Sequence, residues 1–453
     1  MVRSRTGVDT SNPIKTRNFM KKTPGCRLKG LLKVATASLI LGVLSRPVWA
    51  DTTIKVVEVI PSPARTALLQ QEFASFEKSH PGIKIQLISL PWAEAFEKFL
   101  NMVQAGDTPD IVEMPDRWLG LYANNDQLLD LTADFKNTPA LANLSSRALQ
   151  FGSAVHDKLY EIPYGFYVRG LFWNKNLFAQ AGLSAPPATL ADFISDAKKV
   201  SALPGKYGYC MRGGPGGFSG ITMFMNTMDG QPGYFHPDGT STMSDPGSIQ
   251  GLQLLATMYK DGSAPPDSVN WGFNEIVAGF DSGTCAMLDQ DPDALIGIAG
   301  KMNADDFAVA PIPVGPGGKA YPTLGYGGWS IFANSPHKDA AWQLLSFMVS
   351  LDNNLAWSKV VGTLPIYKDA EQNPHFQSDK FKGWFTELSD SSKYVLVTPP
   401  TYLEGFGDLY DNISIKTFQQ VLLGQRTAKD VADQWASYLT DQLKAYKAHQ
   451  SAN

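Results

Sequence analysis

The chain has 453 residues, of which 43% are hydrophobic and 18% are charged, with 39 Lys and Arg against 43 Asp and Glu. Residues 1–50 hold ten of the basic residues and one acidic residue, so the remainder carries a net charge of −13. A surface this acidic repels nucleic acid and anionic lipid, so neither is expected as a partner. The remaining chain, about 400 residues, is long enough for two α/β domains.

The first 50 residues have the features of a cleavable signal peptide. A basic region ends at Lys33, and the apolar run 34–44 is too short to span a bilayer. Val48 and Ala50 provide small residues at the positions that signal peptidase reads, which places the mature start near Asp51. Met20 is an alternative initiator to Met1. No Cys lies directly after the apolar run, because Cys26 precedes it, so a lipid anchor is not expected. We predict a periplasmic protein that is not anchored to the membrane.

The mature chain begins with alternating strand and helix patterns. Residues 53–60 form a strand rich in β-branched side chains, and Ile83, Ile85 and Leu87 alternate as a second strand after a helical pattern. A second helix then leads to a short strand at residues 111–114. This β-α-β-α-β order predicts a mainly parallel sheet with helices on its faces.

An aromatic stretch at residues 160–174 separates this run from the next one. Pro163 and Gly165 interrupt it, which argues against one buried central strand. We interpret the stretch as a crossover and hinge between two α/β lobes, with its aromatic residues and Arg169 facing an interdomain cleft. An edge strand whose aromatic side chains are simply packed is the alternative.

The second run begins with a helix, for which Thr189 and Asp192 predict a capping box. Strand patterns follow at residues 207–211 and 284–288. The glycines of residues 213–217 lack the Lys and the spacing of nucleotide-binding loops, so we interpret them as a turn.

Two cysteines, Cys210 and Cys285, follow residue 50, and both lie on predicted strands of the second run. An exported protein can form a disulfide, but a core of this size does not need one, so we predict two free thiols. The six His are scattered singly, so neither a metal nor a cofactor is expected.

Several short motifs occur in a specific order along the mature chain. They are FEKSHPGIK at 76–84, GDTPDIV at 106–112, YEIPY at 160–164, WNK at 173–175, APIP at 310–313, GGWS at 327–330 and GTLP at 362–365. In order and spacing they resemble the family 1 extracellular solute-binding proteins, which are sugar-capturing subunits of bacterial ABC importers. The resemblance covers essentially the whole mature chain.

The resemblance implies a non-enzymatic protein with the type II periplasmic binding protein fold. This α/β fold has two lobes, each a mainly parallel sheet flanked by helices, which are joined by a hinge and close around a ligand. Lobe 1 is expected to comprise residues 51–163 and 329–364, and lobe 2 residues 164–328 and 365–453. The implied partners are a carbohydrate and the membrane permease of an ABC importer; a monomer without a cofactor is expected.

Sugars present apolar ring faces and a rim of hydroxyls, so their sites pair aromatic platforms with planar polar groups. We expect such residues on loops after strand ends, where open α/β sheets place their ligands. The resemblance adds Trp329 as an aromatic platform after two glycines, and ligand contacts in the loop of Tyr402 and Glu404. The full candidate set is Ser62, Arg65, Trp92, Asp116, Trp118, Tyr164, Tyr167, Arg169, Phe218, Trp271, Asp289, Asp291, Gly328, Trp329, Tyr402 and Glu404.

Each candidate also has an ordinary structural role that the sequence leaves open. The tryptophans could belong to the core, and Asp116, Asp289 and Asp291 could cap helices or stabilise turns.

Other functions also stay open at this point. An exported glycoside hydrolase would use Asp289 with Asp291, or Glu113 with Asp116, as its carboxylate pair. The same fold could bind iron or a polyamine, but no adjacent tyrosines occur and the loop tryptophans favour a carbohydrate. An acidic sugar is a further alternative, because several arginines fall near strand ends. They are Arg65, Arg117, Arg169 and Arg212.

Overall fold

The computed structural model describes residues 52–378 and 380–452. The predicted signal peptide and the two possible initiators therefore lie outside the described residues. Within the described part of the chain, no helix is both long enough and apolar enough to cross a membrane.

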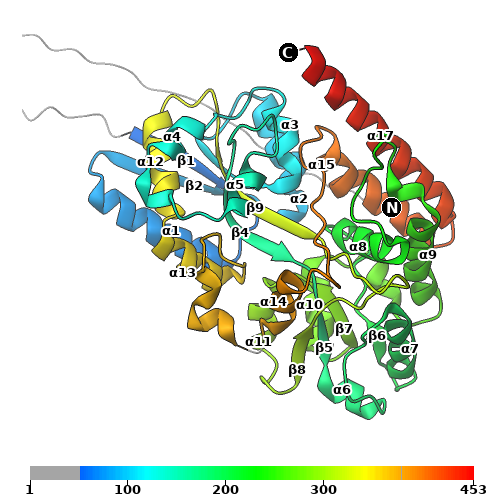
Figure 1. Ribbon diagram of the computed structural model, residues 1–453. Helices are drawn as coiled ribbons and strands as arrows, with labels where there is room; N and C mark the ends of the chain where they lie inside the picture. Colours follow the sequence, from blue (N-terminus) through cyan, green and yellow to red (C-terminus); the bar gives the residue numbers. More distant parts are fainter. Residues whose placement is uncertain (1–51, 379, 453) are drawn as a thin grey trace, which may run out of the picture. The chain divides into compact units, whose positions relative to one another are not determined.

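The first sheet has five strands in the order β2-β1-β3-β9-β4 (Figure 1). Its strands are β1 (Thr52–Glu58), β2 (Ile83–Ser89), β3 (Ile111–Pro115), β4 (Ile162–Val168) and β9 (Leu324–Ile331). Strand β1 runs parallel to β2 and β3, whereas β9 runs antiparallel to β3 and β4. Neighbouring residues of β1 alternate between two cores, as Val56 and Val57 show, so both faces of this sheet are covered. The predicted β-α-β-α-β order is confirmed.

The second sheet has four strands in the order β6-β7-β5-β8. Its strands are β5 (Gly170–Asn174), β6 (Tyr207–Tyr209), β7 (Cys285–Gln290) and β8 (Phe307–Ala310). Strand β6 is parallel to β7, and β5 is antiparallel to both β7 and β8. The antiparallel strand of the first sheet is β9, which the chain reaches after β8 of the second sheet. The antiparallel strand of the second sheet is β5, which the chain reaches after β4 of the first sheet. Each sheet is otherwise parallel, as predicted.

Helices cover both sheets (Figure 1). Helices α1 and α13 pack on each other and on β2 and β4, respectively, whereas α10 packs on β7 and α14 on β8. The helices up to β5 are α1 (Pro63–Ser79), α2 (Trp92–Gln104), α3 (Leu119–Ala123), α4 (Thr132–Lys136) and α5 (Ser146–Gly152). Those from β5 to β8 are α6 (Lys175–Gln180), α7 (Leu190–Ser201), α8 (Phe218–Asp229), α9 (Pro246–Lys260), α10 (Phe273–Asp281) and α11 (Ala294–Ala299). Those after β9 are α12 (Lys338–Met348), α13 (Leu351–Val361), α14 (Lys382–Ser389), α15 (Phe406–Asp408), α16 (Ser414–Leu422) and α17 (Ala428–Ala452).

Local sequence signals explain several helix starts. Ser62 caps α1 by accepting a hydrogen bond from the backbone of Arg65, and Pro63 occupies the first helical position. The predicted capping box of Thr189 and Asp192 is present at the start of α7.

The chain leaves the first sheet at Arg169, between β4 and β5, and returns to it after Thr323, at the start of β9. The backbone N–H of Arg169 donates to the carbonyl of Thr323 at 3.2 Å, so these two crossings lie side by side. Strand pairing places residues 164–168 and 324–328 in the first sheet, so the crossings lie about five residues nearer to the second sheet than the sequence suggested. Pro163 and Gly165, which interrupt the aromatic stretch, flank a shift of register in β4.

Cys210 and Cys285 form a disulfide with their Cα atoms 5.5 Å apart, so the prediction of two free thiols is wrong. Strand β6 pairs in parallel with β7, and the N–H of Cys210 donates to the carbonyl of Met287 just beyond the paired region. The two cysteines are thus neighbours across adjacent strands. Core size, on which the prediction depended, does not determine this proximity.

Candidate ligand-binding site

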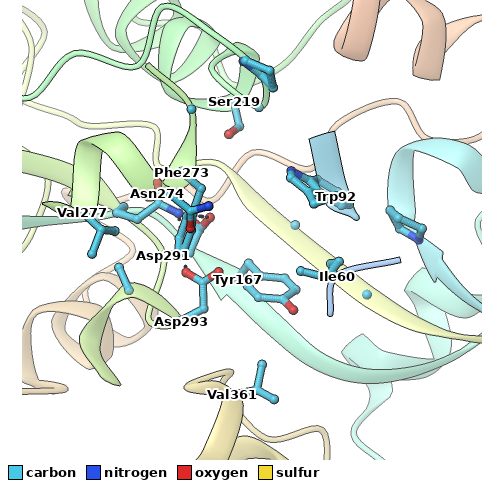
Figure 2. A pocket seen from close by; sticks show the side chains of 18 of the residues that line it. Ile60, Trp92, Tyr167, Ser219, Phe273, Asn274, Val277, Asp291, Asp293 and Val361 are labelled. Carbon is cyan, nitrogen blue, oxygen red and sulfur yellow. Dashed lines mark hydrogen bonds between the residues drawn. The ribbon is translucent and has the colours of Figure 1, made fainter. Parts of the chain in front are cut away.

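A cavity of about 760 Å³ is lined by loops from both sheets. Figure 2 shows Ile60 and Trp92 on one side of it and Phe273 and Asp291 on the other, with Tyr167 between them. Most of these residues follow the carboxyl ends of strands: Ile60 follows β1, Trp92 follows β2 and Asp291 follows β7. This is the position at which open α/β sheets place their ligands.

Seven of the sixteen candidate residues line the cavity, and most of them lie on loops directly after strands or at a crossing. They are Ser62, Arg65, Trp92, Asp116, Tyr167, Arg169 and Asp291.

Trp329, Gly328 and Tyr164 do not line the cavity. The side chain of Trp329 is 1% exposed and packs against the rings of Tyr164 and Trp357, at centroid distances of 5.9 and 6.1 Å. Gly328 lies against Glu161, because a Cβ at this glycine would be 2.3 Å from a carboxylate oxygen of that residue. Trp329 therefore lies in the core and not, as expected, in the cavity wall, and none of these three residues contributes to that wall.

Three further candidates are packed or bonded elsewhere. Trp118 is 1% exposed, and its indole N–H donates to Asp411 at 3.0 Å. Phe218 is buried against the rings of Phe406 and Trp435. None of them contributes to the cavity wall, and neither does Trp271, which packs beside Gly279 of α10.

The last three candidates that lie off the cavity wall are Asp289, Tyr402 and Glu404. Asp289 is 3% exposed and accepts hydrogen bonds from Arg169 and from the hydroxyl of Tyr209. It therefore holds the cavity residue Arg169 in position without lining the cavity itself. Tyr402 packs on the ring of Tyr446 at a centroid distance of 4.9 Å, and Glu404 is exposed.

One wall of the cavity is built on a buried ion pair between Arg65 and Glu113. The other oxygen of Glu113 accepts from the backbone N–H groups of Val59 and Ile60 at 2.8 and 3.1 Å. The hydroxyl of Tyr164 also donates to Glu113, at 2.8 Å. These bonds fix the loop after β1. They also occupy both oxygens of the Glu113 carboxylate.

Arg169 joins the crossing to the second sheet. Its Nη1 donates to the carbonyl of Asp289 at 2.9 Å and to the side chain of Gln290 at 2.8 Å, and its Nη2 donates to Ser219. The side chain is 2% exposed and its Nε lies 3.7 Å from a carboxylate oxygen of Asp291. Arg169 therefore fixes both the β7 end and the start of α8 where they reach the cavity.

Arg117 lies between two aromatic rings of the cavity wall. Its guanidinium carbon is 4.4 Å from the ring centroid of Trp92 and 4.5 Å from that of Tyr410, and its Nε donates to Asp411 at 3.0 Å. This stack connects α2 with the turn of residues 409–413 and holds the Trp92 ring in position.

Three acidic residues of the cavity wall have raised pKa values, of which Asp116 is buried and Asp291 and Asp293 are half-buried. Burial raises the pKa of Asp116 to about 6, although Arg117 and two backbone N–H groups lower it. Burial and the neighbouring Asp291 raise the pKa of Asp293 to about 7, and burial also raises the pKa of Asp291. In their ionised form these carboxylates can accept hydrogen bonds from ligand hydroxyls.

Several wall residues were absent from the predicted set. The amino end of α10 contributes Phe273, Asn274 and Glu275, although the sequence pointed to the nearby Trp271. The helix pattern could have revealed them, because Glu275 caps the N–H of Gly272 and so marks the helix start. Other such residues are Ser219, Asn270, Gln290, Asp293, Tyr326 and Tyr410, for which the sequence offers no comparable signal.

Val277 of α10, Ile296 of α11 and Val361 of α13 add apolar surface to the cavity wall. In the described part of the chain, no group of three or more His, Cys, Asp or Glu side chains could hold a metal ion.

Several curated relatives of this chain are binding proteins by name. A galactooligosaccharide-binding protein of Bacillus subtilis (strain 168) is 25% identical over 394 residues, covering 83% of this chain and 87% of its own length. A protein of Brucella abortus (strain 2308) named as a binding protein is 27% identical over 357 residues, covering 78% of this chain and 84% of its own.

Solved structures show the same fold. The maltose-bound MalE3 of T. maritima superposes with a TM-score of 0.75 at 21% identity, covering 86% of this chain and 99% of that one. The GacH receptor of Streptomyces glaucescens GLA.O, solved without ligand and with acarbose, has a TM-score of 0.75 at 21% identity, covering 87% and 99%. The type II periplasmic binding protein fold is confirmed.

The family model described as bacterial extracellular solute-binding protein matches residues 61–354, which is more than half of the chain. The protein therefore belongs to the bacterial extracellular solute-binding protein family.

Proposed function

We propose that this protein captures a carbohydrate in the cavity and delivers it, chemically unchanged, to the membrane permease of an ABC importer. The observation that carries the proposal is the composition of the cavity wall. The wall contains the aromatic rings of Trp92, Tyr167 and Phe273. It also contains the carboxylates of Asp116 and Asp291. Such rings bind the apolar faces of a sugar, and the carboxylates accept hydrogen bonds from its hydroxyls.

The named relatives support the same class of ligand. The Bacillus subtilis protein is named for galactooligosaccharides, and the two solved structures contain maltose and acarbose. A volume of about 760 Å³ lies in the range of small-molecule sites and accommodates a mono- or oligosaccharide.

The alternative of a glycoside hydrolase needs a catalytic carboxylate pair, either Glu113 with Asp116 or Asp289 with Asp291. Glu113 is held by Arg65 and Tyr164, and Asp289 is held by Arg169 and Tyr209, and neither carboxylate lines the cavity. Each of the two suspected carboxylate pairs therefore has one member that cannot reach a bound glycoside. This supports a binding function without catalysis.

We infer delivery by closure of two lobes. Lobe 1 would comprise the first sheet and its helices, and lobe 2 the second sheet and its helices, with crossings at Arg169 and Thr323. A ligand that contacts Trp92 in lobe 1 and Phe273 in lobe 2 makes both contacts fully only in the closed form, so it shifts the population toward that form. The permease would then recognise the closed monomer in the periplasm, after the signal peptide of residues 1–50 has been removed.

Titration calorimetry against a panel of mono-, di- and oligosaccharides tests the proposal, with chromatography of the recovered sugar. We expect binding of at least one sugar and its recovery intact. Trp92→Ala should lower that affinity by about 10- to 100-fold, since an aromatic platform contributes roughly 1–3 kcal/mol. Trp342→Ala is the matched control, because this half-buried Trp of α12 lies off the cavity.

Small-angle scattering with the same sugar tests closure separately. The radius of gyration should fall when the sugar binds. Conversion of the sugar, or equal affinity of the Trp92→Ala variant and the wild type, would contradict the proposed function, whereas identical scattering profiles would contradict only the closure.

A further inference from the structure

The cavity wall contains four arginines, and three of them are neutralised by carboxylates of this chain. Arg65 pairs with Glu113, and Arg117 pairs with Asp411 at 3.0 Å. Arg169 pairs with Asp289 at 3.1 Å. These three guanidinium groups serve mainly to hold the loops that form the site.

Arg212 is the exception. Its Nε donates to the backbone carbonyl of Pro215 at 2.7 Å, which leaves its two terminal nitrogens free to act as donors. Among residues 52–378 and 380–452, no carboxylate oxygen lies within 4.0 Å of its guanidinium nitrogens. The side chain is half-buried and lines the cavity. It therefore presents to the cavity a positive charge that no carboxylate of the described chain neutralises at contact distance.

The glycine-rich loop holds this guanidinium in place. Gly216 has a φ of +80°, and a Cβ at this position would lie 2.2 Å from a terminal nitrogen of Arg212. The positive φ and the close approach of the guanidinium both favour glycine at this position. The loop that the sequence identified as a plain turn thus positions a charged group.

We propose that the natural ligand is a sugar carrying an anionic group, of which a uronic acid carboxylate is the simplest form, and that Arg212 binds this group. The inference rests on the proposed function, since it specifies the class of carbohydrate. A guanidinium with two free terminal nitrogens matches the two oxygens of a carboxylate, and it also matches a phosphate or sulfate ester.

The surroundings of Arg212 fit such a ligand. Its guanidinium carbon is 5.9 Å from the ring centroid of Phe273, whose ring also lines the cavity and can stack on a sugar ring. Burial and the positive charge of Arg169 lower the pKa of Arg212 to about 10, which marks a place where an added anion is favoured electrostatically. Asp291 and Asp293, which also act on this charge, line the cavity and can accept hydrogen bonds from the hydroxyls of the same sugar.

Titration calorimetry with matched pairs of sugars tests the inference. The pairs are glucuronate with glucose, galacturonate with galactose and digalacturonate with digalactose, together with the 6-phosphates of both hexoses. We expect at least one acidic sugar to bind about 10-fold or more tightly than its neutral parent, because hydrogen bonds to charged groups are the stronger class. Preference for uronates over the phosphates, or the reverse, identifies the anion.

Variants then assign the preference to one side chain. Arg212→Gln should abolish the preference for the acidic sugar, with a loss of about 10- to 100-fold in its affinity, and should leave the affinity for the neutral parent within about threefold. Arg212→Lys should restore part of the preference. Arg147→Gln is the matched control, because this arginine of α5 is also without a carboxylate partner in the described residues but does not line the cavity.

Each outcome has a definite meaning. If neutral sugars bind as tightly as acidic ones, or if Arg212→Gln weakens both equally, the inference is overturned and the proposed function stands. If the folded wild-type protein binds no sugar, acidic or neutral, and no sugar raises its melting temperature, the proposed function and the inference both fail.

Discussion

Removing the Cys210–Cys285 disulfide should destabilise the protein by several kcal/mol. The bond joins residues that are 75 positions apart, and both side chains are fully buried. The chain-entropy relation for a closed loop of that length gives about 4.5 kcal/mol at 25 °C, through the freedom that the unfolded chain regains. This is a large part of the 5–15 kcal/mol that is usual for a folded domain.

The perturbation is the double substitution Cys210→Ala and Cys285→Ala, which avoids leaving one reactive thiol. Guanidinium unfolding of the wild type, with and without reductant, and of the double variant measures the change in free energy of unfolding. Reductant should lower the wild-type midpoint and leave that of the variant unchanged. Thiol titration of the denatured protein without the predicted signal peptide, and hence without Cys26, should find no free thiol without reductant and two with it. Two free thiols without reductant, or a variant within about 1 kcal/mol of the wild type, would refute the reasoning.

Three further predictions follow from buried groups. Trp329→Ala should cost about 3–5 kcal/mol of stability and leave sugar affinity nearly unchanged, and a loss of affinity at a constant melting temperature would restore its role as a platform. Gly328→Ala should lower the melting temperature, because its Cβ would lie 2.5 Å from a backbone carbonyl oxygen of β4, whereas Gly317→Ala meets no atom within 4 Å and should be neutral. Burial raises the pKa of Glu72 to about 8, and burial with a neighbouring carboxylate raises that of Asp293 to about 7. The folded state therefore holds protons that the unfolded state releases, so stability should fall as pH rises from about 5 to 8, and Glu72→Gln should flatten the curve of denaturant midpoint against pH.

Local patterns predicted most of the architecture. Alternation of Ile83, Ile85 and Leu87 identified β2, and the capping pair Thr189 and Asp192 identified the start of α7. The rule that ligands bind after strand ends also predicted part of the site. Trp92, which begins α2 after the short loop that follows β2, lines the cavity. These signals are local because hydrogen bonding and burial periodicity involve residues close in the chain.

Features that depend on which strands are adjacent in a sheet could not be predicted from the sequence. The disulfide forms because β6 pairs with β7, and the order of strands in a sheet is not contained in the spacing of Cys210 and Cys285. Trp329 follows the cavity-lining Gly327 by two residues along β9, so it lies deeper in the sheet, where Trp357 covers it. The sequence does not tell where along a strand the cavity ends.

The hydrogen bond between the backbones of Arg169 and Thr323 has a mechanical consequence. It joins two of the places where the chain passes between the sheets, so in the proposed closure these two crossings lie close to the axis of rotation. The displacement of a residue grows with its distance from the axis, so Arg169 stays in nearly constant geometry while Trp92 and Phe273 approach each other. Contacts with Arg169 then add affinity equally in every state and cannot bias the equilibrium, whereas contacts with the outer rings can. Affinity and closure would thus be encoded by different residues of one cavity, and each could change without the other.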